Sequence, residues 1–88
     1  MQIVFDPNKD AANKEKHGIS LVDGSDFEWN EAVLWPDVRW DYGEARMVGI
    51  GYIGNRLFVI IFVDRAQERR IISLRKANKR EEIIYAQA

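Results

Sequence analysis

The sequence predicts an α+β fold, in which two N-terminal helices pack on a four-stranded, mainly antiparallel sheet and a short helix ends the chain. Three observations support this prediction: an Asp-Pro helix start near the N-terminus, a two-residue Gly-Asn turn between two apolar segments, and a helix cap after the last alternating segment. The expected order is β-α-α-β-β-β-β-α. A chain of 88 residues buries enough surface for only one core, so residues 1–88 are expected to form one domain.

The ends of the two N-terminal helices are marked by capping residues. Asp6-Pro7 predicts a helix start, because the aspartate accepts bonds from free backbone N–H groups and proline loses no donor at the first helical position. This helix is expected to end near His17, with Gly18 in the left-handed conformation that closes helices. Ser20 and Asp23 have the spacing of a capping box and predict a second, shorter helix.

Four later segments have the apolar composition or the alternation of strands. They are Ala32–Trp35, Ala45–Ile53, Arg56–Val63 and Arg69–Leu74, and Gly54-Asn55 closes a tight hairpin between the middle two.

Pairing of Ile53 with Arg56 would set the register of that hairpin. Gly49 and Gly51 then share one face of the sheet with large apolar residues of the next strand, and they leave room there for a bulky side chain. In the last strand, strict alternation places Ile72 and Leu74 on one face of the sheet, with Ile71, Ser73 and Arg75 on the other.

Asn78 followed by Glu81 has the spacing of a second capping box. It predicts a last helix that carries Ile83, Ile84 and Tyr85.

The net charge of −1 hides a strong asymmetry along the chain. Between Asp23 and Glu44 there are seven acidic residues and one base, Arg39, whereas between Arg65 and Arg80 there are seven bases and one acid. A concentrated basic segment predicts a local field that attracts phosphate groups. The alternative, which charge alone leaves open, is a solvated basic face.

Composition also narrows the function classes. The chain has no cysteine and one histidine, so we expect no disulfide, no metal site and no cofactor. The N-terminus has neither the basic nor the apolar region of a secretion signal, and the longest apolar run, Leu57–Val63, is too short to span a bilayer. We therefore expect a cytoplasmic protein without a membrane partner.

Several motifs together resemble one known family. They are Phe5-Asp6-Pro7 with Lys9 and Asn13, Lys16-His17-Gly18-Ile19-Ser20, Tyr42-Gly43-Glu44 with Arg46, and Arg70-Ile71-Ile72-Ser73-Leu74-Arg75-Lys76-Ala77 with Glu81 and Tyr85. In order and spacing they resemble the BrnT toxins of bacterial type II toxin–antitoxin systems.

The resemblance implies a RelE-like fold and a metal-independent endoribonuclease that cleaves RNA and inhibits translation and growth. It also implies neutralisation by a dimeric, DNA-binding antitoxin of the BrnA type, in a complex that binds its own operator DNA.

Cleavage of RNA without a metal requires cations that neutralise the phosphorane oxygens, and arginine suits this role because its planar fork meets two phosphate oxygens at once. Arg70 and Arg75, which flank the Ile-Ile-Ser run, and Arg46 are candidates for such a phosphate clamp. The alternative is that these arginines face a partner or solvent. The RNA-binding candidates are Lys76, just before the last helix, and Lys79 and Arg80 at its start.

The candidates for proton transfer are Glu44, Glu81, Tyr85 and His17. Each also has a structural interpretation: Glu44 as an ion-pair partner of Arg46, Glu81 as a capping residue and Tyr85 as part of the core. For His17 the structural interpretation is preferred, because an imidazole at a helix C-terminus readily caps carbonyls.

A second function stays open at this point. The net charge of −1 and the lack of an obvious base are also compatible with a non-catalytic binding module of the same fold, which engages a protein partner or nucleic acid. Trp29, Trp35 and Trp40 are candidate partner contacts, although a small core also uses tryptophan.

Overall fold

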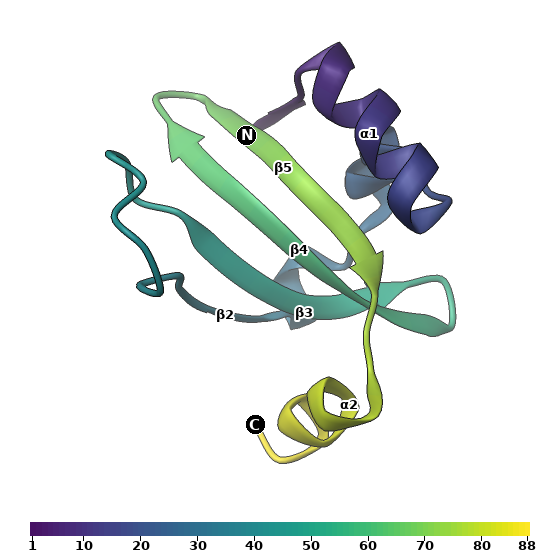
Figure 1. Cartoon of the computed structure of the whole chain (residues 1–88). Helices are drawn as coiled ribbons and strands as arrows, with labels where there is room; N and C mark the ends of the chain where they lie inside the picture. Colours follow the sequence, from purple (N-terminus) through teal and green to yellow (C-terminus); the bar gives the residue numbers. More distant parts are fainter.

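The computed structural model describes residues 1–88 as a five-stranded mixed sheet with helices at its edge and end (Figure 1). The strand order is β1-β5-β4-β3-β2. The elements are β1 (Gln2–Val4), α1 (Pro7–His17), the 3-10 helices η1 (Leu21–Asp26) and η2 (Trp29–Glu31), β2 (Val33–Pro36), β3 (Met47–Ile53), β4 (Arg56–Arg65), β5 (Glu68–Lys76) and α2 (Lys79–Ala86).

The α+β class is confirmed, but two details of the prediction were wrong. The sheet has five strands rather than four, because the first strand of the expected order, β1, belongs to it and pairs with β5 in the parallel direction. The second helix is not α-helical. The predicted Ser20–Asp23 capping box does not form there; the Ser20 hydroxyl accepts from the N–H of Val22 and donates to the carboxylate of Asp10, and the segment makes only 3-10 turns.

The first helix follows its capping signals. The Asp6 carboxylate accepts a 2.7 Å bond from the N–H of Asn8, and Pro7 opens the helix. At the other end, Gly18 has φ 73° and donates its N–H to the carbonyl of Lys14. The predicted bounds of α1 are thereby confirmed.

Asn13 joins α1 to the edge of the sheet. It is 5% exposed, and its Nδ2 donates to the carbonyl oxygens of Leu74 at 2.8 Å and Ile19 at 2.9 Å. Its Oδ1 accepts from the N–H of Leu74 at 3.1 Å. Both backbone groups of Leu74 that face away from β4 are therefore satisfied by one side chain, as a neighbouring strand would satisfy them.

The predicted register of the central hairpin is confirmed. Ile53 pairs with Arg56, and Gly49 and Gly51 face the same side as the residues opposite them on β4. A Cβ at Gly51 would lie 2.6 Å from Cζ of Phe27, so this glycine provides the space that the aromatic ring fills.

The predicted alternation of the last strand was wrong, because a β-bulge interrupts it. Ser73 pairs with Ile61 but Ile71 pairs with Phe62, so that Ile72 is the extra residue on β5. Ile71 and Leu74 consequently enter the same core cluster. Ile72 and Ser73 both face the opposite side of the sheet, together with Arg75.

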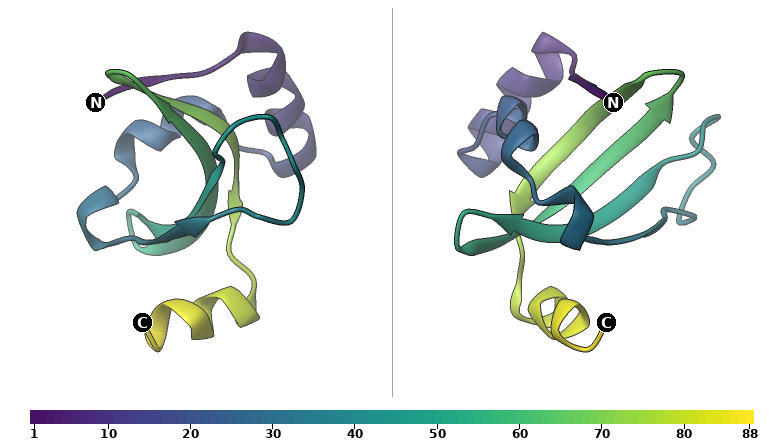
Figure 2. Two further views of the ribbon diagram at one scale, coloured as in Figure 1. Left: turned by 90° about the vertical axis from the view of Figure 1, so that its left-hand side faces the viewer. Right: turned by 180° about the vertical axis from the view of Figure 1, so that it is seen from behind.

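The two faces of the sheet are covered differently. One face carries the larger core. There Leu21 of η1, Phe27 between the two 3-10 helices and Trp29 of η2 pack against β4 and β5. The other face has a smaller cluster on β3 and β4, with Trp35 and Tyr85 packed against it. The sheet is curved, and α2 lies beyond the ends of the strands, so part of this second face stays open (Figure 2).

Loss of the Asn13 amide should destabilise the fold more than an equivalent change elsewhere on α1. We expect Asn13→Ala to lower the free energy of unfolding by roughly 2–4 kcal/mol, because the N–H and C=O of Leu74 lose their partner in a buried position. Asn8→Ala is the matched control, since the side chain of Asn8 is exposed and makes no hydrogen bond. Urea unfolding measures both, and equal stability of the two variants would contradict the role given to Asn13.

Candidate active site

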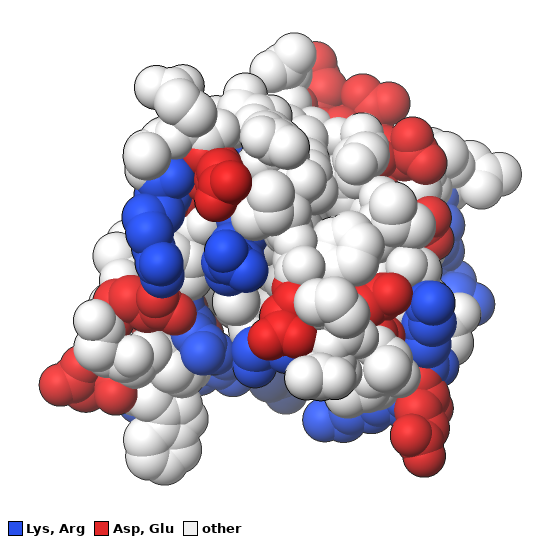
Figure 3. Space-filling view, turned by 90° about the horizontal axis from the view of Figure 1, so that it is seen from above, with Lys and Arg blue, Asp and Glu red and all other residues white.

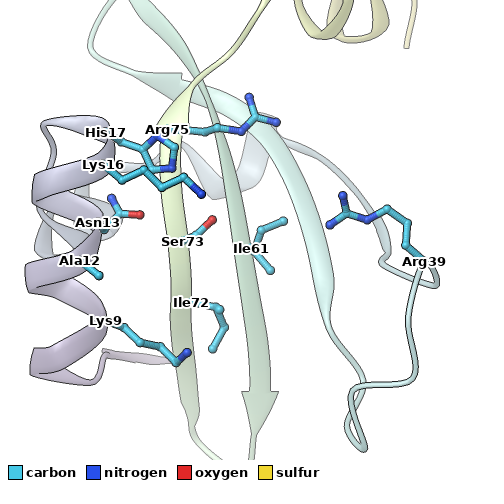
Figure 4. A pocket seen from close by; sticks show the side chains of 10 residues that line it. All are labelled: Lys9, Ala12, Asn13, Lys16, His17, Arg39, Ile61, Ile72, Ser73 and Arg75. Carbon is cyan, nitrogen blue, oxygen red and sulfur yellow. The ribbon is translucent and has the colours of Figure 1, made fainter.

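The open part of the second sheet face forms a hollow of about 370 Å³ between α1 and the 37–46 loop (Figure 4). Its lining residues are Lys9, Ala12, Asn13, Lys16, His17, Arg39, Ile61, Ile72, Ser73 and Arg75. We call this space the basic hollow. A neighbouring hollow of about 270 Å³ shares Arg39, Ile61 and Arg75 with it, so the two form one groove across β4.

The basic hollow receives positive charge from three separate elements. Lys9 and Lys16 lie on one face of α1 with Asn13 between them, at the spacing of successive helical turns. Neither lysine forms an ion pair. Arg39 enters from the loop on the far side, and Arg75 extends from β5 across the floor.

The guanidinium group of Arg75 is held in place by Glu81 of α2. Its Nη1 and Nη2 donate to the two carboxylate oxygens at 2.8 and 2.7 Å. Glu81 also accepts from the N–H of Asn78, which confirms the predicted capping box. The bonds from Arg75 lower the pKa of Glu81, so this carboxylate is ionised and cannot donate a proton. It orients Arg75.

Arg39 is held in the same way, by Asp37. Its Nε and Nη2 donate to the two oxygens of that carboxylate at 2.9 Å each, and the hydroxyl of Tyr42 donates at 3.2 Å. The Asp37 side chain is 2% exposed, and the bonds from Arg39 lower its pKa to about 2. The side chain of Arg39 is 70% exposed and keeps Nη1 free.

Sequence reasoning missed this pair as part of the site. The available signal was that Arg39 is the single base within an otherwise acidic stretch, which indicates a buried or paired carboxylate close by.

His17 lines the basic hollow and is half-buried. Its imidazole makes no hydrogen bond; the end of α1 is closed instead by the N–H of Gly18 on the carbonyl of Lys14. The preferred sequence interpretation, a carbonyl-capping histidine, therefore does not describe the geometry. Burial, with the positive charges of Lys16 and Arg75, lowers the pKa of His17, which favours the neutral ring at pH 7.

The structure does not bring every predicted site residue to the basic hollow. Arg70 faces the same side of the sheet as Arg75, since both pair with residues of β4 on that face, but it does not line the hollow. Glu44 contacts Arg65 at 3.0 Å and Arg46 at 3.9 Å, which agrees with its interpretation as an ion-pair partner. Arg46 stacks 4.0 Å from the centre of the Tyr42 ring, in the loop outside the hollow.

Tyr85 also lies elsewhere. Its hydroxyl donates to the carbonyl of Glu31 at 3.1 Å, and its ring packs edge-on against Tyr52 with centroids 5.4 Å apart. Both contacts agree with its structural interpretation. Three predicted RNA-binding residues, at the end of β5 and the start of α2, are exposed and form no ion pair; they are Lys76, Lys79 and Arg80.

Several arginines of the basic segment are neutralised by carboxylates. Arg65 pairs with Glu44 and Arg69 with Asp64. Seen from above, basic and acidic side chains are interleaved over the surface (Figure 3). The segment therefore does not form a uniform basic face, and the basic hollow is where cations of different elements meet.

No group of three or more His, Cys, Asp or Glu side chains is arranged to hold a metal ion. Neither helix is long and apolar enough to cross a membrane.

Comparisons with known proteins bear on this site. A family model described as the ribonuclease toxin BrnT of type II toxin–antitoxin systems matches residues 5–81. Among solved structures, the crystal structure of the Brucella abortus ribonuclease toxin BrnT matches with a TM-score of 0.72 and 26% sequence identity. The match covers 90% of this chain and 99% of the Brucella chain. No curated protein matches the chain.

The Asp37–Arg39 pair should make stability depend on acid. The pKa of Asp37 in the folded protein, about 2, is below its ordinary value of 3.8, so its contribution is complete above about pH 4 and is lost as the pH falls toward 2. We expect Asp37→Asn to be less stable than the wild type at pH 7, with the difference shrinking across that window. Urea unfolding at each pH measures it. The exposed Asp26→Asn is the control, and a difference independent of pH would contradict the account.

Proposed function

The chain belongs to the BrnT family of ribonuclease toxins of type II toxin–antitoxin systems, and we propose that it cleaves RNA in the basic hollow between α1, β5 and the 37–46 loop. The observation that carries the proposal is the convergence of Lys9, Lys16, Arg39 and Arg75 on one space. In this proposal residues 1–88 act as one toxin domain.

The arrangement suits a phosphodiester. Arg39 and Arg75 are each oriented by a carboxylate, and both keep N–H groups free for a second acceptor. Donors that are fixed before the substrate arrives stabilise developing charge without the cost of reorganisation. The two unpaired lysines of α1 lie along one wall, where they attract the backbone of a single strand.

The proposed reaction is transfer of the phosphoryl group to the neighbouring 2′-oxygen. The 2′-hydroxyl loses its proton as its oxygen bonds to phosphorus, and the bond from phosphorus to the 5′-oxygen breaks as that oxygen gains a proton. Arg75 and Arg39 neutralise the phosphorane oxygens between these two events. The protein's own cations supply this charge in the proposal, so no metal ion is required.

Several finer expectations belong to the same proposal. Lys76, Lys79 and Arg80, exposed beside Arg75, extend the contact with RNA. Arg70 and Arg46 contribute at most to the field around the groove, because they lie outside the hollow. Membership of a type II family implies an antitoxin partner and an RNA substrate. We propose that this antitoxin is a dimeric, DNA-binding protein of the BrnA type, that the complex binds its operator, and that the toxin acts in the cytoplasm.

The central test is removal of the Arg75 guanidinium. We expect Arg75→Ala to lower the single-turnover rate of RNA cleavage by about 100- to 1,000-fold, because an oriented donor to the phosphorane is lost. Arg65→Ala, at the end of β4 away from Arg75, is the matched control and should retain the wild-type rate, because Arg65 pairs with Glu44 outside the hollow. Wild-type activity of Arg75→Ala would contradict the proposal that RNA is cleaved in the basic hollow. Binding of RNA without new fragments, at any excess of wild-type protein, would favour the non-catalytic module.

The wild type and Arg75→Ala can also be compared in bacterial cells. Expression of the wild-type chain should arrest bacterial growth, and Arg75→Ala should relieve the arrest although the protein accumulates. Co-expression of the cognate antitoxin should restore growth of cells with the wild-type toxin, and the two proteins should copurify. Separate elution of the two would contradict the partner assignment.

A further inference from the structure

The proposed reaction requires a group that takes the proton of the 2′-hydroxyl, and most candidates are occupied elsewhere. Glu81 holds Arg75 and caps α2, while Glu44 pairs with arginines outside the hollow. The hydroxyl of Tyr85 donates a hydrogen bond to the carbonyl of Glu31. Each of these groups has a partner that accounts for its position.

His17 differs from these residues in its location and in its lack of a hydrogen-bond partner. It lines the basic hollow beside Arg75, and its ring nitrogens have no partner within the chain (Figure 4). A half-buried imidazole without a hydrogen bond, at the wall of a cationic space, has a nitrogen free for a substrate proton.

We propose that His17 is the general base of this toxin, which withdraws the proton from the 2′-hydroxyl of an RNA strand bound across the groove. The inference rests on the proposed function, because it takes the basic hollow as the place of cleavage. The proton passes from the 2′-oxygen to a ring nitrogen as that oxygen bonds to phosphorus. The departing 5′-oxygen takes a proton from water that enters the open hollow.

The surrounding charges keep the base in its active, neutral form. Lys16 adjoins it on α1, Arg75 faces it from β5, and Lys9 and Arg39 add positive charge from farther along the hollow. No carboxylate lines the basic hollow; Asp37 and Glu81, which line the neighbouring hollow, are paired with Arg39 and Arg75. Burial, with the positive charges of Lys16 and Arg75, lowers the pKa of His17, which favours the neutral ring at pH 7 without an acidic partner.

Placement on α1 gives this base a fixed distance from the phosphate contacts. Asn13, one helical turn earlier, is bonded to both backbone groups of Leu74, the residue that precedes Arg75. The base and the phosphate clamp are therefore joined through a short, rigid path from helix to strand.

The test is the pH dependence of single-turnover cleavage by the purified protein. The wild-type rate should fall on the acid side as His17 becomes protonated. His17→Asn and His17→Gln should cleave about 100- to 10,000-fold more slowly and lack that acid limb. Their binding to an uncleavable 2′-O-methyl RNA should stay within about threefold of the wild type, since a neutral ring contributes little to phosphate affinity.

Two further measurements separate a base from a structural residue. Arg75→Gln should be slow but keep the acid limb, and the midpoint of that limb should move to higher pH, because the pKa of His17 rises when the charge of Arg75 is removed. Added imidazole should partly restore cleavage by His17→Gly.

Wild-type rates and an unchanged pH profile for folded His17→Asn would overturn the assignment of the base, while a slow Arg75→Ala would leave the proposed site intact. If Arg75→Ala is also as fast as the wild type, the proposed site itself fails. The two failures are thus distinguished by one pair of variants.

Discussion

The hydrogen bonds between Asn13 and Leu74 are the constraint on which the rest of the structure depends. Strand β1 pairs with β5 only over Gln2–Val4, so β5 would otherwise end as a bare edge. One amide side chain satisfies the outward N–H and C=O of Leu74, and it fixes α1 beside that edge. Lys9, Lys16 and His17 face the open side of the sheet as a consequence.

The second constraint is how the charges are paired. The chain has a net charge of −1, yet its candidate site is cationic, because acidic residues are used to neutralise arginines elsewhere or to orient them. The carboxylates of Asp37 and Glu81 pair with Arg39 and Arg75, and each pair fixes the direction of its guanidinium group. Lys9 and Lys16 of α1 have no such partner, and they set the sign of the field in the groove. Local pairing, rather than total charge, decides where an anion is attracted.

The sequence predicted the features of the fold that neighbouring residues determine, and it missed those that depend on residues far apart in the chain. Caps and tight turns are local, so α1, the capping box at Asn78 and the hairpin register followed from neighbouring residues. The bulge at Ile72 was missed, because alternation says nothing about an extra residue that a distant strand accommodates. The parallel pairing of β1 and the 3-10 form of η1 likewise depend on contacts far along the chain.

The residues of the candidate site also differ in how far the sequence predicted them. Arg75 and Glu81 were marked by the motif that resembles the toxin family, whereas Arg39 carries no motif and enters the site only because the 37–46 loop folds toward α1. His17 was assigned a capping role that the glycine after it performs.

The most direct test of the account is to map where RNA contacts the protein. NMR spectra of the labelled wild-type chain, titrated with an uncleavable 2′-O-methyl oligonucleotide, report this residue by residue. The account predicts that signals of α1 from Lys9 to His17, of Arg39, and of β5 from Ile72 to Arg75 shift together and saturably. Shifts confined to the separate hollow between the β3–β4 turn and the end of α2, around Asn55, Arg56 and Tyr85, would contradict it.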